Sequence, residues 1–105
     1  MKKSFITLFA ILLFLVSWAQ EGTIRGFVYE ETTGEPVIFT NVYLDKTTLG
    51  STTNENGYFS ITDIPPGDYT LMITALGYDS LTDNISVQPG KIITKKYFVE
   101  KADKY

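Results

Sequence analysis

The chain has 105 residues, enough for one domain, and from Gln20 onward it carries seven Lys/Arg against twelve Asp/Glu, a net charge of −5. This acidic balance argues against nucleic-acid binding, because such binding needs clustered cations that displace counterions. The sequence has no Cys and no His. It therefore has no disulfide framework, no lipid-attachment cysteine, and neither the usual general base nor the commonest metal ligand.

The first nineteen residues have the organisation of a secretory signal peptide. A basic head precedes an almost unbroken apolar run of twelve residues over 5–16, and Ser17 and Ala19 put small residues at the −3 and −1 positions of a cleavage site. The alternative is a membrane-spanning helix, which needs about 20 apolar residues. We therefore expect export, cleavage between Ala19 and Gln20, and a mature chain that begins at Gln20.

Short β-type runs alternate with clusters of Gly, Pro and Asn from Gly22 to Tyr78, and a turn signal recurs about every ten residues. Seven or so short strands with such spacing are typical of a small β-sandwich. No segment after the signal peptide has a helical period. The sequence therefore predicts one all-β domain over 20–100, followed by the start of a linker over 101–105.

Period-2 alternation predicts which residues of the first two strands face the core. These residues are Ile24, Gly26, Val28, Ile38, Thr40, Val42 and Leu44. A turn over 30–36 separates the strands, where Gly34 can supply a positive φ and Pro36 lacks the donor that pairing within a sheet requires. The polar run over 47–53 is predicted to be a short strand at a sheet edge.

Residues 54–57, Asn-Glu-Asn-Gly, are predicted to form a tight hairpin, because Asn-Gly is a strong hairpin signal. Phe59 and Ile61 then point inward. The alternative is the front of a calcium loop, which needs six to eight oxygen ligands and usually a carboxylate further on. Residues 58–62 offer no carboxylate, so the hairpin is preferred and no tightly bound metal is expected.

The run 64–69 is predicted to be a sharp corner, and Tyr69 follows Gly67 as in a tyrosine corner, where the hydroxyl bonds back to the loop backbone. An ordinary core tyrosine is the alternative. Further strands are predicted around Ile85 and Val87 and over 92–100. The two faces of the last strand are not separable, since apolar residues occur on both.

No catalytic constellation stands out. The acidic pairs at 30–31 and at Asp79 and Asp83 lie in turns or at strand ends, and no His or Cys is present to activate a Ser or Thr nucleophile. Several predicted outward-facing aromatic residues remain, and they serve either as a platform for sugars or proteins or as packing on a second face. They are Phe27, Tyr29, Tyr43, Tyr58 and Tyr97.

Six short motifs occur together over 24–44 and 49–79. They are Gly-x-Val at 26–28, Thr-Gly-Glu-Pro at 33–36, Asn-Val at 41–42, a Gly-to-Phe run at 50–59, Pro-x-Gly-x-Tyr-x-Leu at 65–71 and Gly-Tyr at 77–78. As a set they resemble the carboxypeptidase regulatory-like domain family. The positions that carry the resemblance are Gly26, Gly34, Pro36, Asn41, Gly57, Phe59, Pro66, Gly67, Tyr69, Gly77 and Tyr78. Two departures are Phe39-Thr40 in place of the family's usual Gly-Ala, and Asn54 where Asp is commoner.

The resemblance implies a transthyretin-like (prealbumin-like) fold, a seven-stranded antiparallel Greek-key β-sandwich, with no catalytic residues and no cofactor. Behind a signal peptide, these motifs look most like the N-terminal extension of Bacteroidota TonB-dependent outer-membrane receptors. That implies a periplasmic accessory domain of a nutrient-uptake receptor, which docks on a protein partner such as the receptor plug or barrel or the TonB apparatus. The alternative is a free-standing exported binding module for a glycan or a protein. An enzyme is the third reading.

Overall fold

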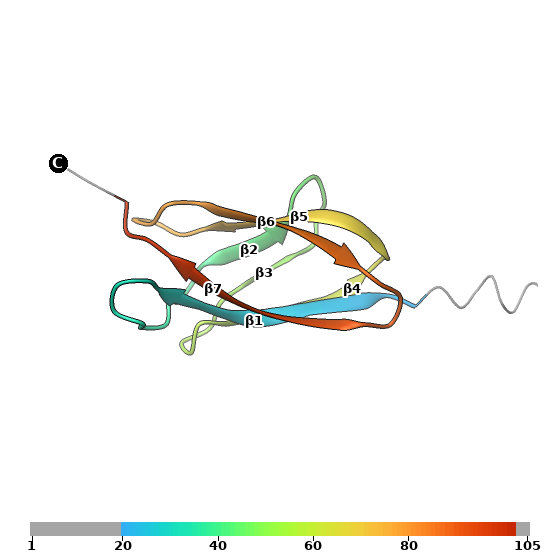
Figure 1. Ribbon diagram of the computed structural model, residues 1–105, viewed down its shortest axis with the longest axis horizontal. Helices are drawn as coiled ribbons and strands as arrows, with labels where there is room; N and C mark the ends of the chain where they lie inside the picture. The colour runs from blue at the N-terminus through green and yellow to red at the C-terminus, as the bar shows by residue number, and fades with distance from the viewer. Residues whose placement is uncertain (1–19, 103–105) are drawn as a thin grey trace, which may run out of the picture.

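The computed structural model describes residues 20–102, and every regular element in that part is a β-strand. The strands are β1 (Gly22–Glu30), β2 (Asn41–Leu44), β3 (Gly50–Thr52), β4 (Tyr58–Ile64), β5 (Gly67–Thr74), β6 (Leu81–Val87) and β7 (Ile92–Val99). They form a three-stranded sheet in the order β4-β1-β7 and a four-stranded sheet in the order β3-β2-β5-β6, which lie as two layers in Figure 1. The expected all-β sandwich is confirmed.

One strand pair differs from the expected antiparallel arrangement. β7 runs parallel to β1, from Thr23 opposite Ile92 to Glu30 opposite Val99. β6 belongs to the other sheet, so residues 88–91 cross between the layers and bring the chain to the start of β1, where Thr23 N donates to Lys91 O over 3.0 Å. β7 therefore starts beside the start of β1 and takes the same direction, while the other strand pairs of the described part are antiparallel.

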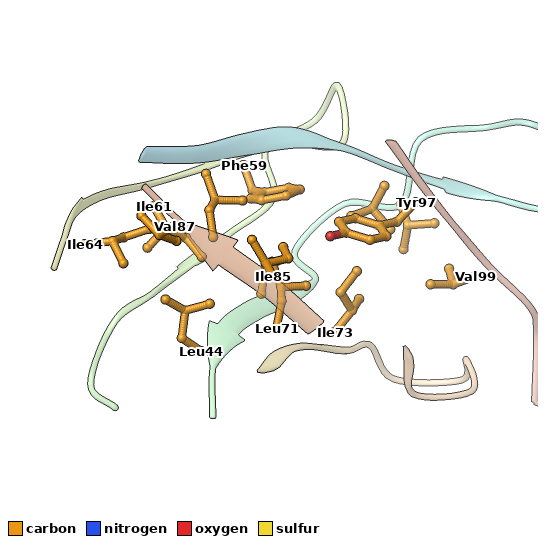
Figure 2. Packing of buried hydrophobic residues seen from close by; sticks show 14 residues of the cluster. Leu44, Phe59, Ile61, Ile64, Leu71, Ile73, Ile85, Val87, Tyr97 and Val99 are labelled. Carbon is orange, nitrogen blue, oxygen red and sulfur yellow. The ribbon is translucent and has the colours of Figure 1, made fainter. Parts of the chain in front are cut away.

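The core lies between the two sheets. Alternate residues of β1 from Gly22 to Glu30 are buried, as a period of two predicts. The rings of Phe59 and Tyr97 pack together with centroids 6.3 Å apart, and Figure 2 shows aliphatic side chains from both sheets around them. The buried hydrophobic residues are Ile24, Val28, Val37, Val42, Leu44, Phe59, Ile61, Ile64, Leu71, Ile73, Ile85, Val87, Tyr97 and Val99.

Gly26 lies where β1 meets β7. A β-carbon at this position would collide with the carbonyl oxygen of Lys95, which is its partner in the parallel register. A larger residue would therefore push the two strands apart, and this explains why a core-facing position in the middle of a strand holds a glycine.

The segment before β2 departs from the predicted strand. Ile38 was expected to face the core, but it is 48% exposed, and β2 begins only at Asn41. Phe39 has a φ of 55°, in the left-handed region, which interrupts the period-2 alternation. Val37, which was not predicted to face the core, is buried, and Thr40 is buried as predicted.

Two buried threonines hold this irregular segment in place. Thr53 Oγ1 donates to Val37 O over 2.7 Å and accepts from Thr40 N over 2.8 Å. Thr40 Oγ1 donates to the same carbonyl over 3.4 Å. Because buried backbone groups need partners, these bonds substitute for the ladder bonds that a regular strand would have made here.

The turn at 54–57 forms as predicted, but it does not join two strands of one sheet. Gly57 has a φ of 76° and donates its N–H to Asn54 O over 2.9 Å. Asn54 Oδ1 accepts from Asn56 N and Tyr58 N, at 2.9 and 3.0 Å. β3 belongs to the four-stranded sheet and β4 to the three-stranded one, so the expected hairpin is in fact a connection between the layers.

The predicted signal peptide lies outside the described residues, whereas the predicted linker lies partly within them. The predicted signal peptide over 1–19, with its cleavage site after Ala19, lies outside the described residues, as do residues 103–105, so these remain predictions. Of the predicted linker, Lys101 forms a bridge with Tyr78, and Ala102 N donates to Gly77 O over 2.9 Å. Within residues 20–102, no helix is long and apolar enough to cross a membrane.

Candidate binding surface

Four aromatic side chains gather on the outer side of the three-stranded sheet, and we call this cluster the aromatic face. It consists of Phe27 and Tyr29 from β1, Tyr58 from β4 and Phe98 from β7. The ring centroid of Phe27 lies 5.9 Å from that of Tyr29 and 5.3 Å from that of Tyr58, while Tyr29 lies 5.8 Å from Phe98. The cluster is continuous across all three strands, and Phe98 is 45% exposed.

Cations accompany these rings. Lys96 Nζ lies 5.8 Å from the centroid of the Tyr29 ring, a cation–π geometry. Arg25, which precedes Phe27 in β1 and lies on the same side of the sheet, donates from Nε to Thr94 Oγ1 over 3.4 Å. The centre of the aromatic face is thus both apolar and positively charged, while Glu31 and Glu100 lie beside Phe98 at its margin.

The structure brings together only part of the predicted aromatic platform. Phe27, Tyr29 and Tyr58 lie together, but Tyr43 is on β2 in the other sheet, opposite Met72. Tyr97 was expected to be exposed and is 7% exposed, in contact with Phe59 in the core. β7 turns its odd-numbered residues inward from position 93 to position 99.

Sequence reasoning missed Phe98 and Lys96, because β7 is apolar on both faces and its alternation could not be assigned. The parallel register with β1 decides which residues of β7 point outward, since it sets Phe98 opposite Tyr29 and Lys96 opposite Phe27. A prediction of that strand pairing would have found both residues.

Tyr97 spans the interior to a carboxylate of β6. Its hydroxyl donates to Asp83 Oδ2 over 2.7 Å, and Lys95 Nζ lies 3.5 Å from the same oxygen. Burial raises the pKa of Tyr97 well above the ordinary tyrosine value, and the hydrogen bond to Asp83 adds to the shift. These contacts link β7 to β6 across the two layers, so their role is structural.

A second polar cluster lies near the end of the described chain. Glu30 is 7% exposed, accepts a hydrogen bond from the Tyr78 hydroxyl over 3.0 Å, and lies 4.0 Å from Lys101 Nζ. The hydrogen bond to Glu30 raises the pKa of Tyr78, and desolvation adds to it. The cluster ties the C-terminal segment to β1 and to the turn after β5.

Tyr69 makes the bond expected of a tyrosine corner, since its hydroxyl donates to Pro65 O over 2.6 Å. The other positions that carry the family resemblance lie in the core, in turns or at strand ends. Phe59 is buried. Positive φ angles occur at Gly34, Gly57, Gly67 and Gly77. Asn41 begins β2, Pro36 forms a bridge with Tyr29, and Pro66 lies in the corner before β5.

Acidic side chains of the described part do not form a metal site. Among residues 20–102, no group of three or more His, Cys, Asp or Glu residues is arranged to hold a metal ion. A shallow hollow of about 230 Å³ adjoins Phe98. Its lining residues are Glu31, Asp79, Ser80, Leu81, Phe98, Val99 and Glu100.

A protein-family comparison agrees with the architecture. A family model described as the CarboxypepD_reg-like domain matches residues 24–104, which is most of the chain. The chain belongs to the CarboxypepD_reg-like domain family. The resemblance seen in the six motifs is confirmed.

Two curated relatives have the same level of identity and different names. Bacillopeptidase F from Bacillus subtilis is 34% identical over 85 residues, and the TonB-dependent receptor SusC from Bacteroides thetaiotaomicron is 34% identical over 83 residues. Each match covers 79% of this chain but only 6% and 8% of the respective relative. The chain thus corresponds to a small part of two much longer proteins.

Two solved structures of bacterial proteins have the same fold. A type II cohesin–X-dockerin complex from Acetivibrio cellulolyticus contains a chain that is 27% identical with a TM-score of 0.67, covering 78% of this chain and 59% of that one. The TIE protein of Bacillus anthracis has a TM-score of 0.63 at 19% identity, covering 79% of this chain and 17% of that one. At this identity the second likeness concerns the fold alone.

Proposed function

We propose that this chain acts without catalysis as an N-terminal accessory domain of a TonB-dependent outer-membrane nutrient-uptake receptor, and that it docks on a protein partner in the periplasm. The single observation that carries the proposal is the match to SusC, which covers most of this chain and a small fraction of the receptor. The acidic balance from Gln20 onward and the signal-peptide pattern over 1–19 agree with an exported location.

The match to bacillopeptidase F, at equal identity and with an equally small share of that protein, supports an accessory role rather than a particular chemistry. A domain found within differently named larger proteins does not by itself carry the function of either, because function belongs to sites and not to the fold. The core of this sandwich is filled by aliphatic and aromatic side chains, so the surfaces left for function are outer faces, edges and loops.

The test is an antibody against residues 20–102 applied to fractionated cells, combined with an in-frame deletion of codons 20–100. The expected result is a band in the outer-membrane fraction far larger than 11.8 kDa. The deletion should leave the amount of the larger protein unchanged and lower uptake of its nutrient. A single soluble band near the size of this chain would refute the receptor assignment.

A second candidate is a free-standing exported module that binds a glycan, and the nearly parallel rings of Phe27 and Tyr29 are the observation on which it rests. Oligosaccharide binding by the purified protein, lost in Tyr58→Ala and kept in Tyr43→Ala, would support it, because only Tyr58 belongs to the cluster. No binding to a glycan array would remove this candidate.

A further inference from the structure

The two outer faces of the sandwich differ sharply in chemistry. Outward positions of the four-stranded sheet are mainly small and polar, and Thr70 Oγ1 there donates to Asn84 Oδ1 over 3.1 Å. These positions include Asn41, Tyr43, Asp68, Thr70, Met72, Thr82, Asn84 and Ser86. The three-stranded sheet instead presents the four rings of the aromatic face. An apolar cluster restricted to one face of a small domain is typical of an interaction site.

The centre of the aromatic face also carries positive charge, unlike the molecule as a whole. The outward positions in the paired register of the three-stranded sheet are Thr23, Arg25, Phe27, Tyr29, Tyr58, Ser60, Ile92, Thr94, Lys96 and Phe98. They include two cations and no carboxylate, in a chain whose net charge from Gln20 onward is −5. Carboxylates lie at the margins of this sheet: the exposed Asp63 is near the end of β4, and Glu31 and Glu100 line the hollow beside Phe98. A partner therefore gains from negative charge where it reaches Arg25 and Lys96, and it is repelled by the acidic margins of the sheet and by the acidic remainder of the molecule.

The ring geometry favours a protein over a sugar. The planes of Phe27 and Tyr29 lie within 9° of each other. The plane of Tyr58 is tilted by 59° from that of Phe27, however, and the plane of Phe98 by 35° from that of Tyr29, so the four rings do not share one plane. Rings inclined to one another do not form the single flat platform on which a row of sugar rings could stack. Inclined rings of Tyr and Phe beside an Arg are instead the composition of protein interface cores.

From these observations we propose that the aromatic face is the docking surface for an apolar segment of a partner protein that carries Asp or Glu side chains. The rings of Phe27, Tyr29 and Phe98 would bury the apolar side chains of that segment. Lys96 and Arg25 would pair with its carboxylates and fix its register, since charged pairs contribute specificity and association rate more than affinity. The proposal deepens the docking function proposed above and rests on it.

The first experiment maps binding on ¹⁵N-labelled protein recovered from the periplasm after export. The probes are two synthetic peptides of equal length with the same Leu and Trp positions, one with Glu and the other with Lys at the remaining positions, and maltohexaose as a third. We expect the Glu peptide alone to shift amide signals, and the shifts to lie in β1, β4 and β7. The proposal would be overturned if the Lys peptide bound equally well, or if the shifts lay in β2, β5 and β6. It would also be overturned by a response to maltohexaose alone, or by no shift at about millimolar peptide.

The second experiment uses variants at exposed positions, so that the fold is retained. Phe98→Ser is expected to weaken the Glu peptide about tenfold, as for a moderate interface hot spot. Lys96→Glu should reverse the preference from the Glu peptide to the Lys peptide. The matched controls are Tyr43→Ser on the opposite face and Lys46→Glu in the turn after β2, and each should change the Kd less than about twofold. Controls that act as strongly as the test variants would contradict the proposal.

Two further measurements distinguish a failure of the docking surface from a failure of the proposed receptor function. Sedimentation equilibrium of the free protein reports self-association, and a dimer abolished by Phe98→Ser would replace the acidic partner with a second copy of the chain. Intact uptake after the deletion of codons 20–100 would remove the receptor function and leave the peptide result standing. Lost uptake in that deletion together with unchanged uptake in Phe98→Ser and Lys96→Glu would remove only the docking surface.

Discussion

Phe39 has a backbone conformation that a side chain with a β-carbon disfavours. Its φ is 55°, and its ring is 75% exposed. The left-handed region costs a non-glycine residue about 1–2 kcal/mol. An exposed ring recovers little of that by burial, so this strain lowers the free energy of unfolding.

Phe39→Gly is therefore expected to raise the free energy of unfolding by about 0.5–1 kcal/mol, because relief of the strain exceeds the extra chain entropy of glycine in the unfolded state. Urea denaturation followed by intrinsic fluorescence measures the change. Ile38→Gly is the matched control, since Ile38 is the neighbouring half-exposed residue, and it should destabilise by a similar amount. A lower denaturation midpoint for Phe39→Gly would show that the exposed ring stabilises the fold.

Thr53 carries the buried hydrogen bonds of the segment before β2. Thr53→Val keeps the shape and removes the oxygen, so Thr40 N loses its acceptor inside the core, while Val37 O keeps the bond from the Thr40 hydroxyl. The variant is expected to lower the free energy of unfolding by about 1–3 kcal/mol, the cost of an unpaired buried donor. Thr52→Val, at the neighbouring exposed position, should change it by less than about 0.5 kcal/mol. Equal effects of the two substitutions would argue against the buried bond as the cause.

At the scale of strands, the pairing of β1 with β7 depends on the absence of a side chain at Gly26. Gly26→Ala places a methyl group against the backbone of Lys95, and strands can relieve that contact only by moving apart. We expect a loss of about 2–3 kcal/mol, in the range of core overpacking. Chemical denaturation measures it, and hydrogen exchange should show faster exchange in β7 than in β5.

Gly34→Ala separates this packing effect from a backbone effect. Gly34 has a φ of 75°, and a β-carbon there meets no atom within 4 Å, so only the conformational cost of about 1 kcal/mol applies. If Gly34→Ala proved as damaging as Gly26→Ala, the close approach of β7 would not be the reason for glycine at position 26.

The strands show how far sequence reasoning reaches. The period of two placed Ile24, Val28 and Phe59 in the core correctly, because each lies in a regular strand with one buried face. The prediction that Ile38 faces the core was wrong, because the left-handed φ of Phe39 interrupts the alternation of inward and outward residues. No propensity scale anticipates that conformation for a phenylalanine.

The candidate binding surface was only partly predictable for a related reason. Its rings on β1 and β4 follow from alternation within each strand. Phe98 and Lys96 depend on which face of β7 points outward, and that depends on pairing with a strand about 70 residues earlier in the chain. A pattern within one strand carries no information about a long-range parallel register.

At the scale of the whole molecule, the two layers are joined by polar contacts as well as by the core. Tyr97 on β7 reaches Asp83 on β6, and Tyr78 reaches Glu30 on β1, so each hydroxyl connects one sheet to the other layer or its loops. Figure 1 shows the described chain entering at one end of the sandwich and leaving at the other, which follows from the parallel β1 and β7. A pull on the two ends would therefore load β1 and β7 along their common direction.

The buried hydroxyl of Tyr97 predicts how stability depends on alkaline pH. Burial and the bond to Asp83 raise the pKa of Tyr97 in the folded state, whereas a tyrosine of the unfolded chain titrates near pH 10. Above about pH 10 the unfolded chain binds fewer protons than the native one. The stabilisation is therefore complete below that pH and declines as the pH rises, by about 1.4 kcal/mol per pH unit for this group. Between about pH 9 and 11.5, the urea midpoint should fall less steeply with pH for Tyr97→Phe than for the wild type. The control is Phe59→Leu, which changes the neighbouring ring but no titrating group. It should lower the midpoint at every pH and keep the wild-type slope of midpoint against pH. Parallel curves for Tyr97→Phe and the wild type would mean that the hydroxyl ionises as readily in the folded sandwich as in the unfolded chain.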